Sequence, residues 1–337
     1  KSPVRAAGAA LVLAAVLATS ARAQECVDCH TKISPGIVED WKTSAHFQED
    51  VGCQMCHGDG HSSAEDVSEL LTVTANTCAA CHAERFEQFS KGKHALAWAS
   101  MKAMPTTHFK PMELIDGMKG CGGCHKLGLK PEEEITRLKA AGSGYGHASC
   151  DACHTRHTFS VREARDPRAC ATCHMGFDHP QWEMYSSAKH GVIWGIEGHE
   201  EDARAPTCQN CHLMEGDHEV RTPWGFLGLR IPTKENVLAL IDVAPTLKEP
   251  LTKLAAALPS GNYIDLDDDP QWTLDRALIL QAAGVLDAGL QPTERFVEIV
   301  VQGEAARGPE EFNTLRAEMK HNCNTCHSAK YVDQHFK

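Results

Sequence analysis

The pattern of apolar and polar positions favours helices, and it is clearest in the C-terminal third of the chain. Residues 270–286, a segment that starts at Thr293, and residues 309–320 each place apolar side chains at helical spacing. Asp269 is a suitable N-cap, because Pro270 follows it at the first helical position. Strand patterns are nearly absent. The apolar positions are Leu274, Leu278, Ala282 and Val285, then Phe296, Val297 and Val300, then Phe312, Leu315 and Met319.

The first residues have the pattern of an export signal. Lys1 and Arg5 precede an apolar run over residues 6–19, and Ala21-Arg22-Ala23 is an A-x-A cleavage site. The run is short for a transmembrane helix, although a retained anchor is the alternative interpretation. We therefore expect residues 1–23 to be a signal peptide and the mature protein to be periplasmic or otherwise exported.

Cysteine gives the most specific signal. The chain has 337 residues and 16 cysteines, and every cysteine belongs to a C-x-x-C-H unit. The units, numbered one to eight in chain order, are Cys26, Cys29 and His30; Cys53, Cys56 and His57; Cys78, Cys81 and His82; Cys121, Cys124 and His125; Cys150, Cys153 and His154; Cys170, Cys173 and His174; Cys208, Cys211 and His212; and Cys323, Cys326 and His327.

This motif has a chemical reason. The two thiols bind the two vinyl groups of one haem, and the adjacent histidine is the proximal iron ligand. A single unit is also compatible with a redox dithiol or half of a zinc site. Eight units with no spare cysteine favour haem, so the sequence predicts eight covalent haems c.

Unit spacing predicts the domain organisation. Seven units are dense and unevenly spaced, which argues against a strict repeat, and the eighth begins far beyond the seventh. We expect a multihaem core over residues 24–230, a helical insertion over 231–320 and the eighth haem segment over 321–337. A haem so near Lys337 needs protein to cover it, so we expect further C-terminal residues. The predicted fold is mainly α, with haems as core material.

Composition agrees with this organisation. Aromatic residues make up only 6% of the chain, which leaves room for porphyrins in the core. The formal net charge of −12 argues against nucleic-acid binding, which requires a basic surface. An acidic surface is compatible with a basic electron-transfer partner.

The stretches 150–160, 170–185 and 187–191, which include Asp178-His179-Pro-Gln-Trp and Ser187-Ala-Lys-His190-Gly, closely resemble hydroxylamine oxidoreductase, a family of octahaem cytochromes c. The resemblance extends over nearly the whole mature chain. It implies a catalytic haem on Cys150, Cys153 and His154, with Asp178 and His179 in its distal pocket. A histidine beside a carboxylate can exchange protons near neutral pH. From spacing alone, a distal iron ligand is the favoured interpretation of His179, and the resemblance reverses that preference.

The resemblance also implies bis-histidine haems, which transfer electrons but leave no site for substrate. The distal ligands that it implies are His46, His61, His94, His157, His190 and His218. One bis-histidine haem then lacks a match, and His147, His321 or a residue beyond Lys337 is the candidate. His108, His199 and His335 are expected at the surface.

The resemblance implies hydroxylamine oxidation at one five-coordinate haem, with seven bis-histidine haems carrying the electrons away. Oxidising members attach a C-terminal tyrosine of a neighbouring subunit to the catalytic haem, and nothing in this sequence corresponds to it. Reduction of nitrite or hydroxylamine to ammonium, or simple electron carriage, are the alternatives. The implied partners are a small nitrogenous substrate and a c-type cytochrome or quinone-linked electron partner, in a homotrimer.

Overall fold

The computed structural model describes residues 24–98, 101, 120–176, 179–198, 203–221, 238, 248–257 and 309–336. These residues form short helices and loops, without a strand in the described ranges. This bears out the predicted mainly α fold. Of the expected C-terminal helices, those at 270–286 and at Thr293 lie outside the described residues. The third is confirmed by α20 (Pro309–Asn324).

The N-terminal half supplies the first four units. Residues 24–33 are helical and include the first unit. The elements that follow are α2 (Pro35–Thr43), α3 (Ala45–Gln48), α4 (Gln54–His57), η1 (Ala64–Glu69), α5 (Ala75–Ala79), α6 (Ala83–Lys91), η2 (Lys93–Leu96), α9 (Gly122–His125) and α10 (Glu132–Ala140).

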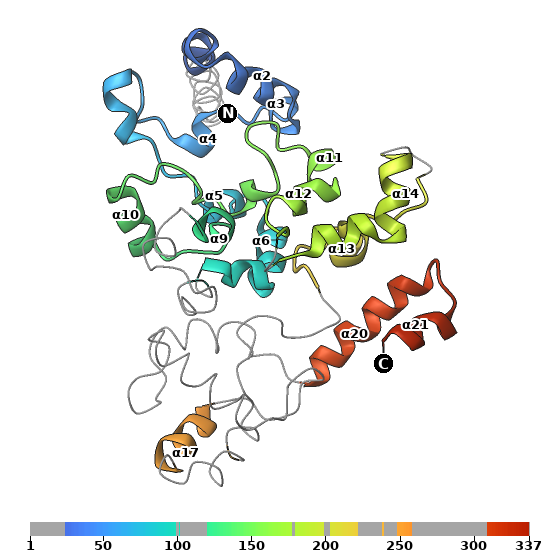
Figure 1. Ribbon diagram of the computed structural model, residues 1–337. Coiled ribbons are helices and arrows are strands. Elements are labelled where there is room, and N and C mark those ends of the chain that lie inside the picture. Colours follow the sequence, from blue (N-terminus) through green and yellow to red (C-terminus); the bar gives the residue numbers. More distant parts are fainter. Residues whose placement is uncertain are drawn as a thin grey trace, which may run out of the picture.

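The remaining elements supply units five to eight. They are η4 (Cys150–Ala152), α11 (Val161–Ala164), α12 (Pro167–Ala171), α13 (Gln181–Ser187), α14 (Lys189–Glu197), α15 (Cys208–His212), η5 (Met214–Gly216), α17 (Lys248–Ala257), α20 and α21 (Ala329–His335). In Figure 1, α2, α3 and α4 lie at the opposite end of the described core from α20 and α21, with α5, α6 and α9 between them.

Local polar contacts explain why the helices are short. The Ser44 hydroxyl ends α2 by donating to Trp41 O, and it also caps α3 by accepting from Phe47 N. Asp166 caps α12 by accepting from Arg168 N, with Pro167 at the first helical position. Such caps satisfy the free amides of a first turn. Each short helix can therefore begin at a defined residue close to a C-x-x-C-H unit.

The protein's own apolar core is thin. Trp98, Met101 and Leu138 form one buried cluster, against which Cys121 packs. Trp98 Nε1 donates to Glu134 Oε1 of α10 at 2.9 Å, so the buried indole keeps its hydrogen bond. This cluster joins η2, α10 and the fourth unit, and it gives that unit a rigid base.

The partly buried Lys130 connects the segments of two units beside this cluster. Lys130 Nζ donates to the carbonyls of Gly128 and Gly146 at 2.9 and 3.1 Å, and lies 4.9 Å from the centroid of the Trp98 ring. Burial lowers the pKa of Lys130 to about 8. The segment after the fourth unit is thereby fixed to the segment that leads into the fifth.

No helix in the described ranges combines the length and the apolar character that crossing a bilayer requires.

Candidate haem sites and catalytic centre

Each C-x-x-C-H unit forms a helical turn. In six units the histidine amide donates to the carbonyl of the first cysteine; examples are His57 N to Cys53 O at 3.0 Å and His174 N to Cys170 O at 2.9 Å. The first unit lies within the helical residues 24–33, and the seventh forms α15. Positions three and four apart share one helix face. The turn therefore directs both thiols and the histidine towards the same haem.

The fold brings histidines from elsewhere in the chain opposite these units. Each of the six predicted distal histidines lies with its ring centroid 5.9–6.3 Å from a unit histidine. The pairs are His30 with His61, His82 with His46, His57 with His157, His174 with His94, His154 with His218, and His327 with His190.

These separations fit an iron shared by two imidazoles. A ligating nitrogen lies about 2 Å from its metal and roughly 1 Å from its own ring centroid, so one metal between two rings separates the centroids by about 6 Å. Two rings that only packed against each other could also lie closer, with their centroids from about 4.5 Å apart. The six pairs cluster near the value for a shared iron. Their role as iron ligands stays a prediction that this geometry supports.

Hydrogen bonds orient several of these rings. Nδ1 of His125 donates to Ala97 O at 2.8 Å, Nδ1 of His212 to Arg221 O at 2.6 Å, and Nδ1 of His218 to Gly216 O at 2.8 Å. A carbonyl only accepts, so Nδ1 carries the proton and Nε2 keeps its lone pair. That tautomer is the one that binds a metal through Nε2.

Burial also favours the neutral ligand form. Burial, followed by the neighbouring His174, lowers the pKa of His94 to about 4. Burial lowers the pKa of His154 as well, with His218 as the next cause. A histidine that stays neutral at physiological pH is ready to coordinate iron.

The structure places His179 away from the unit at which the resemblance implies the catalytic haem. His154, the proximal histidine of the expected catalytic haem, faces His218 at 6.1 Å rather than His179. The His179 ring lies instead 6.2 Å from His125 of the fourth unit and 6.1 Å from His174 of the sixth. The loop after the sixth unit places His179 there, a tertiary arrangement that spacing along the chain does not reveal. Asp178 lies outside the described residues.

Two unit histidines, His125 and His212, therefore remain outside the six pairs. His125 has His179 opposite it, whereas His212 has no histidine ring at pairing distance within the described residues. Neither His147, whose Nε2 bonds to Ser143 O, nor His321 has a ring contact with His212 among the described residues. His335 lies against Tyr331 and is exposed, as expected; His108 and His199 lie outside the described residues.

Cysteine contacts show which units adjoin. Hydrogen bonds between thiols join Cys78 to Cys150 and Cys170 to Cys208. Other thiols interact across neighbouring units: Cys26 with Cys53, Cys56 with Cys78, Cys153 with Cys173, and Cys211 with Cys323. These contacts arrange units one, two, three, five, six, seven and eight in line. We call this line the haem series.

The fourth unit meets the haem series from the side. Cys124 Sγ lies 4.0 Å from the carbonyl of Thr172, which belongs to the sixth unit. His179 links the same two units, since it lies beside both His125 and His174. A haem on the fourth unit would thus lie next to the sixth unit, as a branch from the haem series that the other seven units form. This position would suit a reaction centre that transfers its electrons to the other haems.

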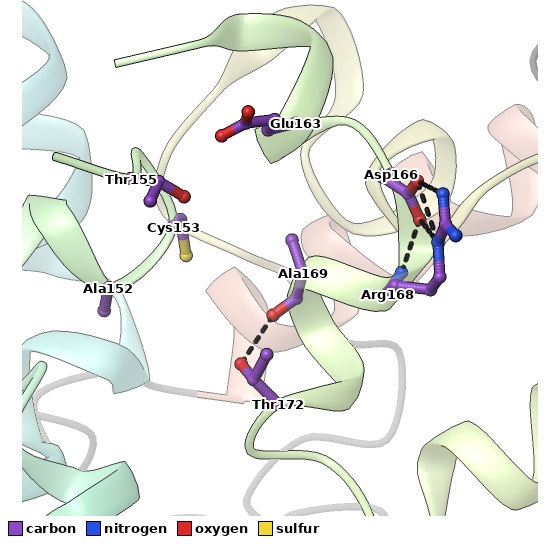
Figure 2. A pocket seen from close by; sticks show the side chains of 8 residues that line it. All are labelled: Ala152, Cys153, Thr155, Glu163, Asp166, Arg168, Ala169 and Thr172. Carbon is purple, nitrogen blue, oxygen red and sulfur yellow. Dashed lines mark hydrogen bonds and ion pairs between the residues drawn. The ribbon is translucent and has the colours of Figure 1, made fainter. Parts of the chain in front are cut away.

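A cavity of about 270 Å³ lies beside the fifth unit (Figure 2). Cys153 and Thr155 line one side, and Asp166, Arg168 and Thr172 line the other. Arg168 holds the Asp166 carboxylate through its guanidinium, so the two charges compensate each other. The cavity is lined by Cys153 of the fifth unit and Thr172 of the sixth, and His179 is not among its lining residues.

Comparisons with known proteins agree with the haem interpretation. The family described as "Seven times multi-haem cytochrome CxxCH" matches residues 49–226, and "Cytochrome c554 and c-prime" matches residues 9–58. A probable nitrite reductase-hydroxylamine oxidoreductase fusion protein of Kuenenia stuttgartiensis is 30% identical over 259 residues, covering 59% of this chain and 26% of that protein. The C-type polyheme cytochrome OmcC of Geobacter sulfurreducens is 23% identical over 214 residues, covering 56% of this chain and 26% of that protein.

Solved structures share the fold. A reducing HAO-like protein complex of Kuenenia stuttgartiensis matches with a TM-score of 0.54 at 23% identity, over 95% of this chain and 58% of that one. A hypothetical multiheme protein matches with a TM-score of 0.56 at 20% identity, over 93% and 77%. Of the two curated relatives described above, the chain covers about a quarter of the length, 26% of each. The predicted resemblance to hydroxylamine oxidoreductase is supported by these matches.

Proposed function

Because this chain belongs to the multihaem CxxCH cytochrome family, with covalent haem c, we propose that it is an octahaem enzyme that oxidises hydroxylamine at the haem of Cys121, Cys124 and His125. The observation that carries this proposal is the position of His179. Its ring lies opposite His125 and adjoins the sixth unit. The fourth haem is proposed as the open one, and the other seven as electron carriers.

The choice between the two remaining units rests on His179. Only His125 and His212 lie outside the six described pairs, so the open iron is proposed at one of them. The rings of His179 and His125 lie 6.2 Å apart, which is the same separation as in the six pairs, so this distance does not distinguish an acid–base group from an iron ligand. The acid–base role is proposed because the resemblance gives the Asp178-His179 motif to the distal pocket of the catalytic haem. We therefore assign His212 to an electron-carrying haem whose distal ligand lies outside the described residues.

The protein's own groups provide for binding and proton transfer. An open haem iron supplies a site for a substrate nitrogen and accepts electrons. Ala97 O fixes the His125 ring through Nδ1, and the Trp98 cluster holds the segment that carries this carbonyl. Hydroxylamine oxidation releases protons with its electrons. The imidazole of His179, on the substrate side, takes up such protons and passes them towards solvent.

The test uses the haem-loaded full chain and His179→Gln. We expect the variant to keep its haems and to lose about 10²–10⁴-fold in hydroxylamine-dependent cytochrome c reduction, the usual loss for removal of a general acid–base group. His321→Ala is the control, because His321 is exposed and unpaired in the described structure. A new high-spin haem in His179→Gln would identify His179 as an iron ligand and overturn the assignment.

Reduction of nitrite or hydroxylamine to ammonium is the second candidate. It is favoured by the fold match to a complex described as reducing. The same site serves both directions, since His179 can donate protons as well as accept them. Assays with hydroxylamine plus oxidised cytochrome c, and with nitrite plus a reduced viologen, separate the two. Turnover in neither assay, with ligand-indifferent haems, would leave electron carriage as the function.

We also propose that the protein works outside the cytoplasm, with a c-type cytochrome or quinone-linked electron partner, and as a homotrimer. The export-signal pattern of residues 1–23 and the need to attach many haems covalently support the location. The net charge of −12 is suited to a basic partner. Fractionation of the native organism and sedimentation of the purified protein test these points.

A further inference from the structure

One axial histidine has an unusual environment in the described structure. Asp66, in η1, accepts a hydrogen bond from Nδ1 of His61 at 2.8 Å. The same carboxylate accepts from Ser62 N at 3.0 Å, Ser62 Oγ at 2.8 Å and Ser63 N at 2.8 Å. The carboxylate is therefore fixed by the three residues that precede η1.

The other axial rings with a described Nδ1 hydrogen bond face neutral acceptors. Three donate to backbone carbonyls and one to a side-chain amide at 3.2 Å. Nδ1 of His30, the partner of His61, is buried and without a hydrogen bond among the described residues. The neutral acceptors are Ala97 O for His125, Arg221 O for His212, Gly216 O for His218 and Gln181 Oε1 for His174.

We propose that Asp66 is a positioning residue that makes the haem of Cys26, Cys29 and His30 the low-potential end of the haem series. A carboxylate that accepts the Nδ1 proton makes the imidazole a stronger electron donor to its metal. It also adds a negative charge close to the iron, which favours the ferric state. The side chains of His61 and Asp66 are 20% and 28% exposed, so water screens this charge only in part.

The position of the first unit gives this tuning a consequence. Cys26 contacts Cys53 of the second unit, and the series then continues to the eighth unit. Figure 1 shows the neighbouring α2 and α4 at the far end of the described core from α20 and α21. An electron delivered to a terminal haem of low potential passes spontaneously to the haems of higher potential in the series. This end is therefore suited to accept electrons from a strongly reducing donor, as the reductive candidate function requires.

The experiment is a spectroelectrochemical titration of the haem-loaded full chain and of Asp66→Asn. Asparagine keeps the shape and an acceptor oxygen for the Ser62 and Ser63 amides but removes the charge. We expect one haem to shift to a more positive potential while all low-spin signals remain. Glu65→Gln is the matched control, because Glu65 is exposed in the same η1 and makes no described side-chain bond to His61.

The inference rests on His61 as the distal ligand of the first haem, which His61→Ala tests independently. That variant should gain one high-spin haem; its absence would remove the premise. Identical potentials in Asp66→Asn and Glu65→Gln would overturn the tuning role, as would loss of a low-spin haem in Asp66→Asn, which would make Asp66 a structural brace. Neither result depends on hydroxylamine turnover, because no substrate is present.

Discussion

The ring centroids of His190 and His327 lie 5.9 Å apart, although His190 belongs to α14 and His327 follows α20. As the proposed axial ligands of the last haem, the two rings would join the last unit to a residue that precedes the seventh unit. The pair would thereby fix the C-terminal helices α20 and α21 to the core. Its loss should be visible both in one haem and in the attachment of this end of the chain.

We expect His190→Ala to convert one low-spin haem to a high-spin or ligand-responsive one, because His327 would keep only its proximal bond. Electron paramagnetic resonance with and without cyanide measures this change. His321→Ala serves as the control and should leave the spectrum unchanged. An unaltered spectrum in His190→Ala would show that His190 is not the distal ligand of the last haem.

Two glycines of α14 allow a controlled test of how this helix packs against α13. A Cβ on Gly191 would lie 2.1 Å from Tyr185 O of α13, whereas one on Gly195 would meet nothing within 4 Å. Gly191→Ala should destabilise the protein by about 1–3 kcal/mol and disturb the neighbouring His190, because the helices must separate. Gly195→Ala should be neutral or stabilise it by up to about 1 kcal/mol, since alanine favours helix. Thermal unfolding compares them; equal effects would contradict this packing.

Haem stoichiometry is predicted from the cysteines. Intact mass of the mature, haem-loaded chain should correspond to eight covalent haems, because all 16 cysteines belong to C-x-x-C-H units. Cys323→Ser combined with Cys326→Ser should remove one haem and leave the rest. A mass that fits disulfides or zinc in place of several haems would be incompatible with this prediction.

Acidification should destabilise the His94 site. Burial lowers the pKa of His94 to about 4, below the ordinary 6.5, and a bond from its ring nitrogen to iron would oppose protonation in the same direction. The unfolded chain therefore binds a proton between these values that the folded chain does not. The free energy of unfolding should therefore fall as pH drops from 6.5 towards 4. His94→Met should weaken this dependence, since methionine does not titrate. Unfolding followed by haem absorbance at several pH values checks the result, and unchanged pH profiles in both proteins would refute it.

The haem-attachment residues could be predicted from the sequence because their spacing is local. Cysteines three apart and a histidine in the next position fall on one face of a single turn, as in α15. The helical character of residues 309–320 was equally local, because the apolar pattern and Pro309 at the start suffice. These features need no knowledge of which segments meet in the fold.

The location of His179 could not be predicted in this way. It follows His174 closely in sequence and was expected at the fifth unit, but the fold places it between the fourth and sixth. Which proximal histidine a distant ring faces depends on tertiary packing around the haems. The role of Asp66 was also missed. Its signal was available as an acidic residue shortly after His61, but many surface loops have the same pattern.

The crossed order of the axial pairs affects how the protein matures. The histidine that pairs with His30 follows after α4, and His46 is already present when His82 is made. His57 must await His157, and His154 must await His218. If the chain is exported with its N-terminus leading and these pairs bind iron, as we propose, some haems complete their coordination early while others wait for later segments. The second and fifth units would then need protection for longer than the first and third.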